Sequence, residues 1–185
     1  MLDQSPQAKV DAVLAKFEKA LASGDIDAAV NLFQEDCYWR DLVTFTWNIR
    51  TLEGRDAIGE MLKTQLAAIK PSHFRQDANE AASDGNGVTE GWFECETQAA
   101  RGYGQIRLKN GLIWTLLTVL SELKDHEEKS GFTRPLGAKH GQNLGAKTWK
   151  EEREEEERTL GYEKQPYVVI IGGGQGGIAL GARLR

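Results

Sequence analysis

The sequence predicts an α+β domain that is followed by the first strand and helix of an α/β dinucleotide-binding unit. The N-terminal third has apolar residues at helical spacing, and the middle alternates apolar and polar residues between turn signals. Near the C-terminus a β-branched run leads directly into a glycine-rich turn. We expect the first domain at residues 1–123, a linker with a charged helix at 124–165, and the start of the second domain at 166–185.

Two helices form the predicted start of the first domain. In the first helix, five apolar residues recur at helical spacing: Val10, Val13, Leu14, Phe17 and Leu21. Gly24 ends that helix, because glycine adopts the left-handed conformation at low cost, and Asp25 or Asp27 caps the next one. The inner face of the second helix is expected to comprise Ile26, Ala29, Val30 and Phe33.

A third helix is predicted between Gly54 and Pro71, with strands on both sides of it. The strands are expected at residues 37–42, 44–47, 74–78, 88–97, 102–108 and 112–123. Asn110 and Gly111 predict a tight hairpin, because both tolerate a positive φ. The final strand is apolar on both faces, so we expect it to be central and covered on both sides.

The linker is rich in glycine and ends in a charged run at residues 150–158. Glu154 and Arg158 are spaced i, i+4 in this run, which favours a solvated helix. A functional acidic patch is the alternative interpretation.

Several classes of function are disfavoured by composition. No stretch approaches 18 consecutive apolar residues, and the start lacks a secretory signal, so a membrane protein is not predicted and we expect the cytoplasm. The net charge of −5 argues against a nucleic-acid partner. Cys37 and Cys95 are expected to be buried free thiols. The three histidines are too scattered to indicate a metal site.

The order of elements over about residues 7–123 resembles the NTF2-like (SnoaL-like) family. The matching details are the helical hairpin at 17–33, the Asp-Cys-Tyr-Trp-Arg-Asp stretch at 36–41, the Leu-Glu-Gly-Arg-Asp-Ala-Ile stretch at 52–58, and the Asn110-Gly111 hairpin. The resemblance implies a cone in which helices pack on a curved antiparallel sheet around an apolar pocket. Some members are isomerases, dehydratases or cyclases, and others only bind small molecules or form homodimers.

An active domain of this kind needs an acid or base inside its pocket. The candidates are Asp41, His73 and Glu94. The alternative is that Asp41 makes local polar contacts and that His73 is a surface residue. Four tryptophans either line the pocket or belong to the core: Trp39, Trp47, Trp92 and Trp114.

The strongest functional motif follows the apolar run at residues 168–171, which is predicted to be a buried parallel strand. The next six residues fit G-x-G-x-x-G and comprise Gly172, Gly173, Gly174, Gln175, Gly176 and Gly177. A helix is expected from Ile178. Gly172 permits the tight turn, Gly174 lets the backbone approach a pyrophosphate, and Gly177 permits close helix–strand packing. The helix N-terminus offers free N–H groups to the phosphates.

Residues 167–184 resemble the FAD-binding start of flavin-containing monooxygenases, and the whole chain resembles those that carry an NTF2-like domain in front. The resemblance implies an enzyme that uses FAD and NADPH to insert oxygen into a small organic substrate, with a Rossmann FAD-binding domain that begins at residue 166. It also implies that this chain is an N-terminal part of the enzyme. The NADPH site and catalytic residues would then lie beyond Arg185.

Two alternatives remain open. The acidic residue that would hold a ribose hydroxyl is expected about 20 positions after the motif, beyond Arg185, so the motif alone does not separate FAD from NAD. A different FAD-dependent pyridine-nucleotide oxidoreductase therefore fits as well. The first domain could instead be a binding or dimerisation module without catalysis.

Overall fold

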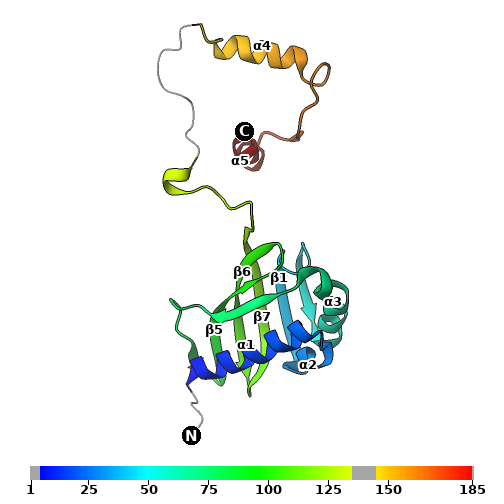
Figure 1. The fold of residues 1–185 in the computed structure, drawn as a ribbon, viewed down its shortest axis with the longest axis vertical. Coiled ribbons are helices and arrows are strands. Elements are labelled where there is room, and N and C mark those ends of the chain that lie inside the picture. The colour runs from blue at the N-terminus through cyan, green and yellow to red at the C-terminus, as the bar shows by residue number, and fades with distance from the viewer. Residues whose placement is uncertain (1–4, 135–144, 185) are drawn as a thin grey trace. The chain divides into compact units, whose positions relative to one another are not determined.

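The computed structural model describes residues 5–134 and 145–184, and the chain divides into two compact units after Arg134 (Figure 1). The first unit holds helices α1 to α3, a seven-stranded sheet and a short 3-10 helix, η1 (Gly131–Thr133). The second unit holds helices α4 and α5. Among the described residues, no helix is long and apolar enough to cross a membrane.

Helices α1 (Pro6–Ser23) and α2 (Ile26–Val30) begin and end at the signals that the sequence contains. The hydroxyl of Ser5 accepts a hydrogen bond from the N–H of Ala8, and Gly24 closes α1 in the left-handed conformation with φ 72°. Asp25 caps α2 through the N–H of Ala28. The expectation that Phe33 belongs to this helix is wrong, because α2 ends at Val30 and Phe33 opens strand β1 (Phe33–Leu42).

The sheet is mixed, which corrects the expected antiparallel sheet. Its strand order is β2-β1-β7-β6-β5-β3, and β4 pairs with β5. Strands β1 and β7 run parallel and the other pairs are antiparallel. The remaining strands are β2 (Ile49–Glu53), β3 (Ser72–Gln76), β4 (Ser83–Gly85), β5 (Val88–Glu96), β6 (Ala100–Lys109) and β7 (Leu112–Leu123). The separate strand expected at residues 44–47 is absent, because these residues form the bend between β1 and β2.

The predicted hairpin at Asn110 and Gly111 is confirmed, with φ values of 50° and 76°. Asn86 and Gly87 turn between β4 and β5 with φ values of 51° and 76°. Positive φ at both central residues matches the twist of the flanking strands, which explains the Asn-Gly pair at each turn.

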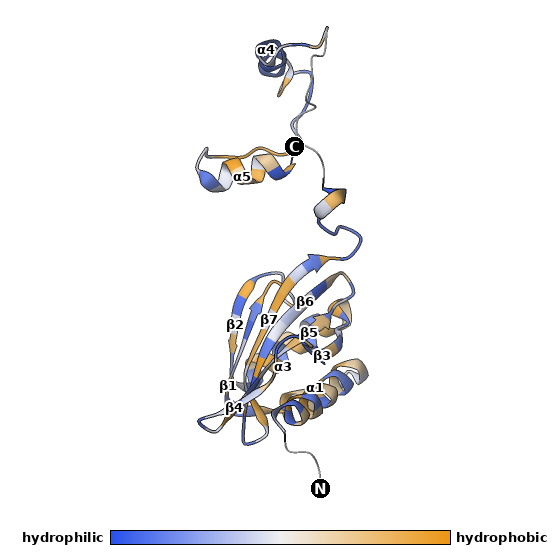
Figure 2. Ribbon diagram, turned by 90° about the vertical axis from the view of Figure 1, so that its left-hand side faces the viewer, coloured by the Kyte–Doolittle hydropathy of each residue, from blue (hydrophilic) through white to orange (hydrophobic). Residues whose placement is uncertain are grey.

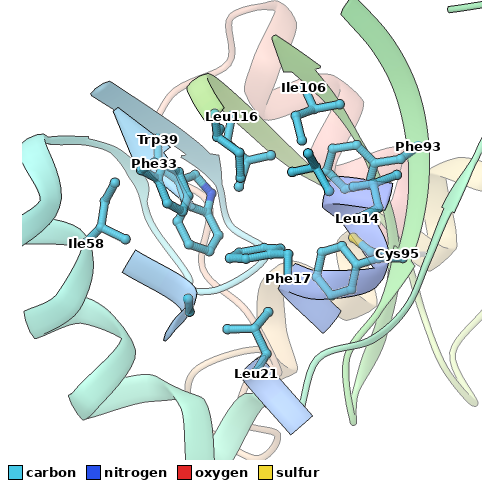
Figure 3. Packing of buried hydrophobic residues seen from close by; sticks show 14 of the residues in the cluster. Leu14, Phe17, Leu21, Phe33, Trp39, Ile58, Phe93, Cys95, Ile106 and Leu116 are labelled. Atoms are coloured by element: carbon cyan, nitrogen blue, oxygen red, sulfur yellow. The ribbon is translucent and has the colours of Figure 1, made fainter. Parts of the chain in front are cut away.

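Helices α1 and α3 (Gly54–Ile69) contact the sheet and bury one of its faces. The core between them is built largely from aromatic and branched side chains, including Phe17, Phe33, Trp39 and Ile58 (Figure 3). Strand β7 is central, as predicted, but it is not covered on both sides. Ile113, Leu116 and Thr118 are buried, whereas the residues between them are half-buried, because the helices lie against one face only.

Two glycines of β6 lie on the inner face and leave no room for a side chain. A Cβ on Gly104 would lie 2.0 Å from the carbonyl oxygen of Leu117 and 2.4 Å from Cζ of Phe93. A Cβ on Gly102 would lie 2.6 Å from the carbonyl oxygen of Val119. The ring of Phe93 thus occupies the space that Gly104 vacates.

The second unit begins with α4 (Trp149–Thr159), the predicted charged helix. Its start is a capping box, in which Thr148 and Glu151 satisfy each other's backbone N–H groups. Helix α5 (Gln175–Leu184) begins three residues earlier than expected, and Figure 2 shows hydrophobic residues along it. The strand predicted at residues 168–171 is wrong for this chain, because no neighbouring strand is present among the described residues to form a ladder with it.

Candidate functional site

Asp41 lies near the end of β1 with its side chain on the inner face, fully buried. Its carboxylate accepts hydrogen bonds from the N–H of Phe45 at 3.1 Å to each oxygen and from the N–H and the hydroxyl of Thr46 at 2.8 Å each. It also accepts one from the hydroxyl of Thr118 on β7 at 2.7 Å. These charge-assisted bonds offset the cost of burying the carboxylate. Asp41 therefore makes the local contacts that the sequence suggested, together with a long-range contact to the central strand.

The hydrogen bonds to Asp41 hold residues 43–48 in a strained bend. Val43 and Trp47 have φ values of 60° and 54°, which are unfavourable for side chains other than glycine and most of all for a β-branched one. Between them, Phe45 is fully buried, with its ring centroid 4.8 Å from that of Trp39. The carboxylate of Asp41 thus fixes a bend that inserts an aromatic ring into the core.

The four candidate tryptophans have separate surroundings. Trp39 is a core residue whose indole N–H donates to the hydroxyl of Thr118 at 2.9 Å. Trp47 is 52% exposed at the tip of the bend. Trp92 and Trp114 are half-buried on the outer face of the sheet, where the Lys109 ammonium lies 3.3 Å from the ring centroid of Trp114. The four therefore do not line one pocket.

His73 and Glu94 both lie on the outer face of the sheet, whereas the side chain of Asp41 lies on the inner face. They line a hollow of about 520 Å³ together with residues from β3, β5, β6 and β7, among them Arg75, Arg101 and Tyr103. We name this the outer-face hollow. The structure therefore brings two of the three candidate acid–base residues together and separates the third. Pairing them requires the register of Arg75 opposite Glu94, which the sequence does not display.

A second concavity, a groove of about 940 Å³, lies between α1 and the two Asn-Gly hairpins. Lys9 at this groove forms an ion pair with Asp84 at 2.7 Å. None of the three acid–base candidates lines it.

Both cysteines are buried free thiols, as predicted. Burial raises the pKa of Cys95 to about 12, with smaller contributions from the negative charges of Asp41 and Glu96. Burial also raises the pKa of Cys37. Because the thiolate is the nucleophile and the metal ligand, neither residue is suited to that chemistry. The described residues contain no group of His, Cys, Asp and Glu that could hold a metal ion.

Gly172 and Gly177 are two positions of the glycine-rich turn where the local structure favours glycine. Gly172 has a φ of 108°, in the region that favours glycine. A Cβ on Gly177 would lie 2.0 Å from the carbonyl oxygen of Gly172 and 3.3 Å from Cγ2 of Ile170. A Cβ on Gly174 would meet nothing within 4 Å, so the space beside that backbone is open. Gly172, Gly173 and Gly174 precede α5, and Gln175, Gly176 and Gly177 form its first turn.

The first unit is thus an α+β domain whose helices cover one face of a curved mixed sheet, with an aromatic core and a buried carboxylate at one strand end. A family model described as the SnoaL-like domain matches residues 13–116. The chain belongs to this family, which confirms the NTF2-like (SnoaL-like) resemblance found in the sequence.

Several solved structures are similar to this chain. A computationally designed 17-OHP binder is 16% identical, with 64% of this chain and 93% of the binder covered and a TM-score of 0.49. The RV0760c protein of Mycobacterium tuberculosis is 16% identical, with 64% and 92% covered and a TM-score of 0.49. An Anabaena Orange Carotenoid Protein that binds canthaxanthin is 17% identical, with 59% and 36% covered and a TM-score of 0.49. No curated protein matches the chain.

Proposed function

We propose that this chain is the N-terminal part of a flavin-dependent monooxygenase that uses FAD and NADPH, with its SnoaL-like domain ahead of an FAD-binding Rossmann domain that begins at residue 166. The observation that carries the proposal is the contact of Gly177 with the carbonyl of Gly172, where an added Cβ would lie 2.0 Å away. In a dinucleotide-binding turn the last glycine lets the helix pack closely on the segment before the turn. A Cβ on Gly177 would likewise lie 3.3 Å from Cγ2 of Ile170 in that segment.

The residues present fit a pyrophosphate. The backbone at Gly174 faces open space, and α5 begins directly afterwards at Gln175. The first main-chain bond of this turn runs from the N–H of Ile178 to the carbonyl of Gly174 at 3.0 Å. The N–H groups of Gln175, Gly176 and Gly177 precede this bond and would donate to the phosphates, where the helix dipole also favours negative charge.

The exposed apolar surface beside the turn supports a domain with further strands. Val169 is 72% exposed and Ile171 is 97% exposed, although both are β-branched residues suited to the interior of a sheet. In the proposed enzyme these side chains are covered by neighbouring strands, which also contact the rest of the cofactor. FAD supplies the redox chemistry when bound, and residues 172–177 supply its position.

The test measures flavin absorbance after desalting of the natural protein that contains these residues and of residues 1–185 alone. We expect bound FAD in the former only, because the turn by itself contacts only the pyrophosphate. NADPH oxidation with formation of an oxygenated product distinguishes a monooxygenase from another FAD-dependent oxidoreductase.

Three glycine variants of the natural protein separate the cofactor contact from folding. Gly174→Val adds a side chain into open space, so we expect the fold to persist and FAD to be lost. Gly177→Ala disturbs the turn itself, and Gly85→Val, which lies in the first unit and also adds a side chain that meets nothing within 4 Å, is the matched control. Undiminished FAD in the Gly174→Val protein would refute the assignment of the motif.

A further inference from the structure

Some charged side chains of the outer-face hollow form ion pairs, and others do not. Glu96 pairs with Lys124 at 2.8 Å, and Arg101 pairs with Glu122 at 3.0 Å and with Glu127 at 2.8 Å. The hydrogen bond from Lys124 holds the pKa of Glu96 below its usual range. These pairs give the hollow a fixed charged border.

Arg75 and Glu94 remain unpaired among the described residues, although they are direct neighbours across the β3–β5 ladder. Opposite charges at such positions normally attract each other. A second Glu–Arg pair on the same face shows that behaviour, because Glu90 and Arg107 are ladder partners across β5 and β6 and join at 3.1 Å. The guanidinium of Arg75 and the carboxylate of Glu94 therefore stay available for another binding partner.

Two further polar groups line the same hollow. His73 lies where the register of β3 shifts, with a φ of 59°. Its main-chain N–H donates to the carboxylate of Glu18 at 2.6 Å. Its Nδ1 lies 3.3 Å from the hydroxyl of Ser72, which leaves Nε2 without a described partner. The hydroxyl of Tyr103, the ladder neighbour of Glu94 on the other side, has no described hydrogen-bond partner either.

We propose that the outer-face hollow binds a small zwitterion, a molecule with a carboxylate and an ammonium group like a free amino acid. The carboxylate contacts Arg75 and the ammonium contacts Glu94, while His73 and Tyr103 offer additional hydrogen bonds. A simple anion or a simple cation would satisfy one of the two opposed charges and lie beside the other. A zwitterion satisfies both, and each contact is a charge-assisted hydrogen bond.

The test is a titration of the full chain followed by NMR, with glycine as the zwitterion and acetate and methylammonium as its two halves. We expect saturable shifts of the His73 ring and of the Glu94 and Tyr103 amides with glycine. Acetate and methylammonium should bind at least about tenfold more weakly, because each makes one of the two charged contacts. Equal binding of acetate and glycine, or no saturable shift with glycine, would overturn the proposal.

Matched variants distinguish the hollow from general charge effects. Arg75→Gln and Glu94→Gln should each weaken glycine binding by about tenfold or more. Arg107→Gln and Glu90→Gln change the same residue types on the same face outside the hollow, so they should leave binding unchanged. Thermal melts check that all four variants fold. Retained binding in the folded Arg75→Gln protein, or equal loss in the Arg107→Gln protein, would contradict the assignment.

Discussion

Strand β7 and residues 168–171 are both apolar, β-branched stretches that the sequence predicts as buried strands, yet they have opposite surroundings. Strand β7 pairs with β1 on one side and with β6 on the other, and Leu116 is 1% exposed. Residues 168–171 form no ladder, and Ile171 is 97% exposed. An apolar run therefore indicates that a segment is suited to a buried strand. Whether the segment is buried depends on neighbouring strands that supply main-chain hydrogen bonds and on a layer that covers it.

The contrast predicts very different costs for the same kind of truncation. Leu116→Ala should lower the free energy of unfolding by about 2–5 kcal/mol, because it leaves a cavity in the core. Ile171→Ala should change it by less than about 0.5 kcal/mol, because the side chain is exposed. Urea denaturation of residues 1–185 measures both. A cost above about 1 kcal/mol for Ile171→Ala, twice the limit for exposed positions, would mean that the segment is covered after all.

The Asp41 network offers a second test of how much the first unit depends on its own contacts. Asp41→Asn replaces an acceptor oxygen with an amide that faces N–H and hydroxyl donors, so we expect a loss of about 1–3 kcal/mol of stability by chemical denaturation. Thr118→Val removes one donor to Asp41 and also the acceptor of the buried Trp39 indole N–H, so we expect a loss of similar size, about 1–3 kcal/mol.

The same substitution tests the role of the SnoaL-like domain in the proposed enzyme. Because the chemistry belongs to the flavin, Asp41→Asn in the natural protein should leave NADPH oxidation and product formation within about 100-fold of wild type, the scale of a general acid or base. A larger loss with unchanged FAD content would assign Asp41 a catalytic part.

The smallest effect is expected from removing the second unit. The first unit has its own sheet and core, so residues 1–134 should unfold cooperatively. Their free energy of unfolding should lie within about 0.5 kcal/mol of that of residues 1–185. Calorimetry of the two chains makes the comparison. A broad, non-cooperative transition for residues 1–134 would contradict the independence of the first unit.

Local signals in the sequence located most elements of the first unit. Some signals depend only on a residue's own backbone conformation or on neighbours a few residues away, so they can be identified from the sequence alone. Such signals are Gly24, Asp25 and the Asn110-Gly111 turn. The parallel pairing of β1 with β7 joins residues such as Asp41 and Thr118, 77 positions apart, and no local pattern encodes that register.

The candidate site divides in the same way. The glycine-rich turn was found because its contacts lie within ten residues. The outer-face hollow was missed because His73 and Glu94 come to line the same hollow only when β3 pairs with β5. The bend after Asp41 had a usable signal, because an aspartate followed closely by two threonines favours local side-chain to backbone hydrogen bonds. The aromatic and β-branched residues around it suggested a strand instead.

Gly102 and Gly104 of β6, where an added Cβ would collide with β7, affect which register the two strands can adopt. If β6 slipped by one residue against β7, Tyr103 or Gln105 would point to the place where even a methyl group would collide with the Leu117 carbonyl. A slipped hairpin would also turn the polar side chains of β6 toward the core. Because only glycine fits opposite the Leu117 carbonyl, the position of Gly104 disfavours a β6–β7 pairing that is shifted by one residue.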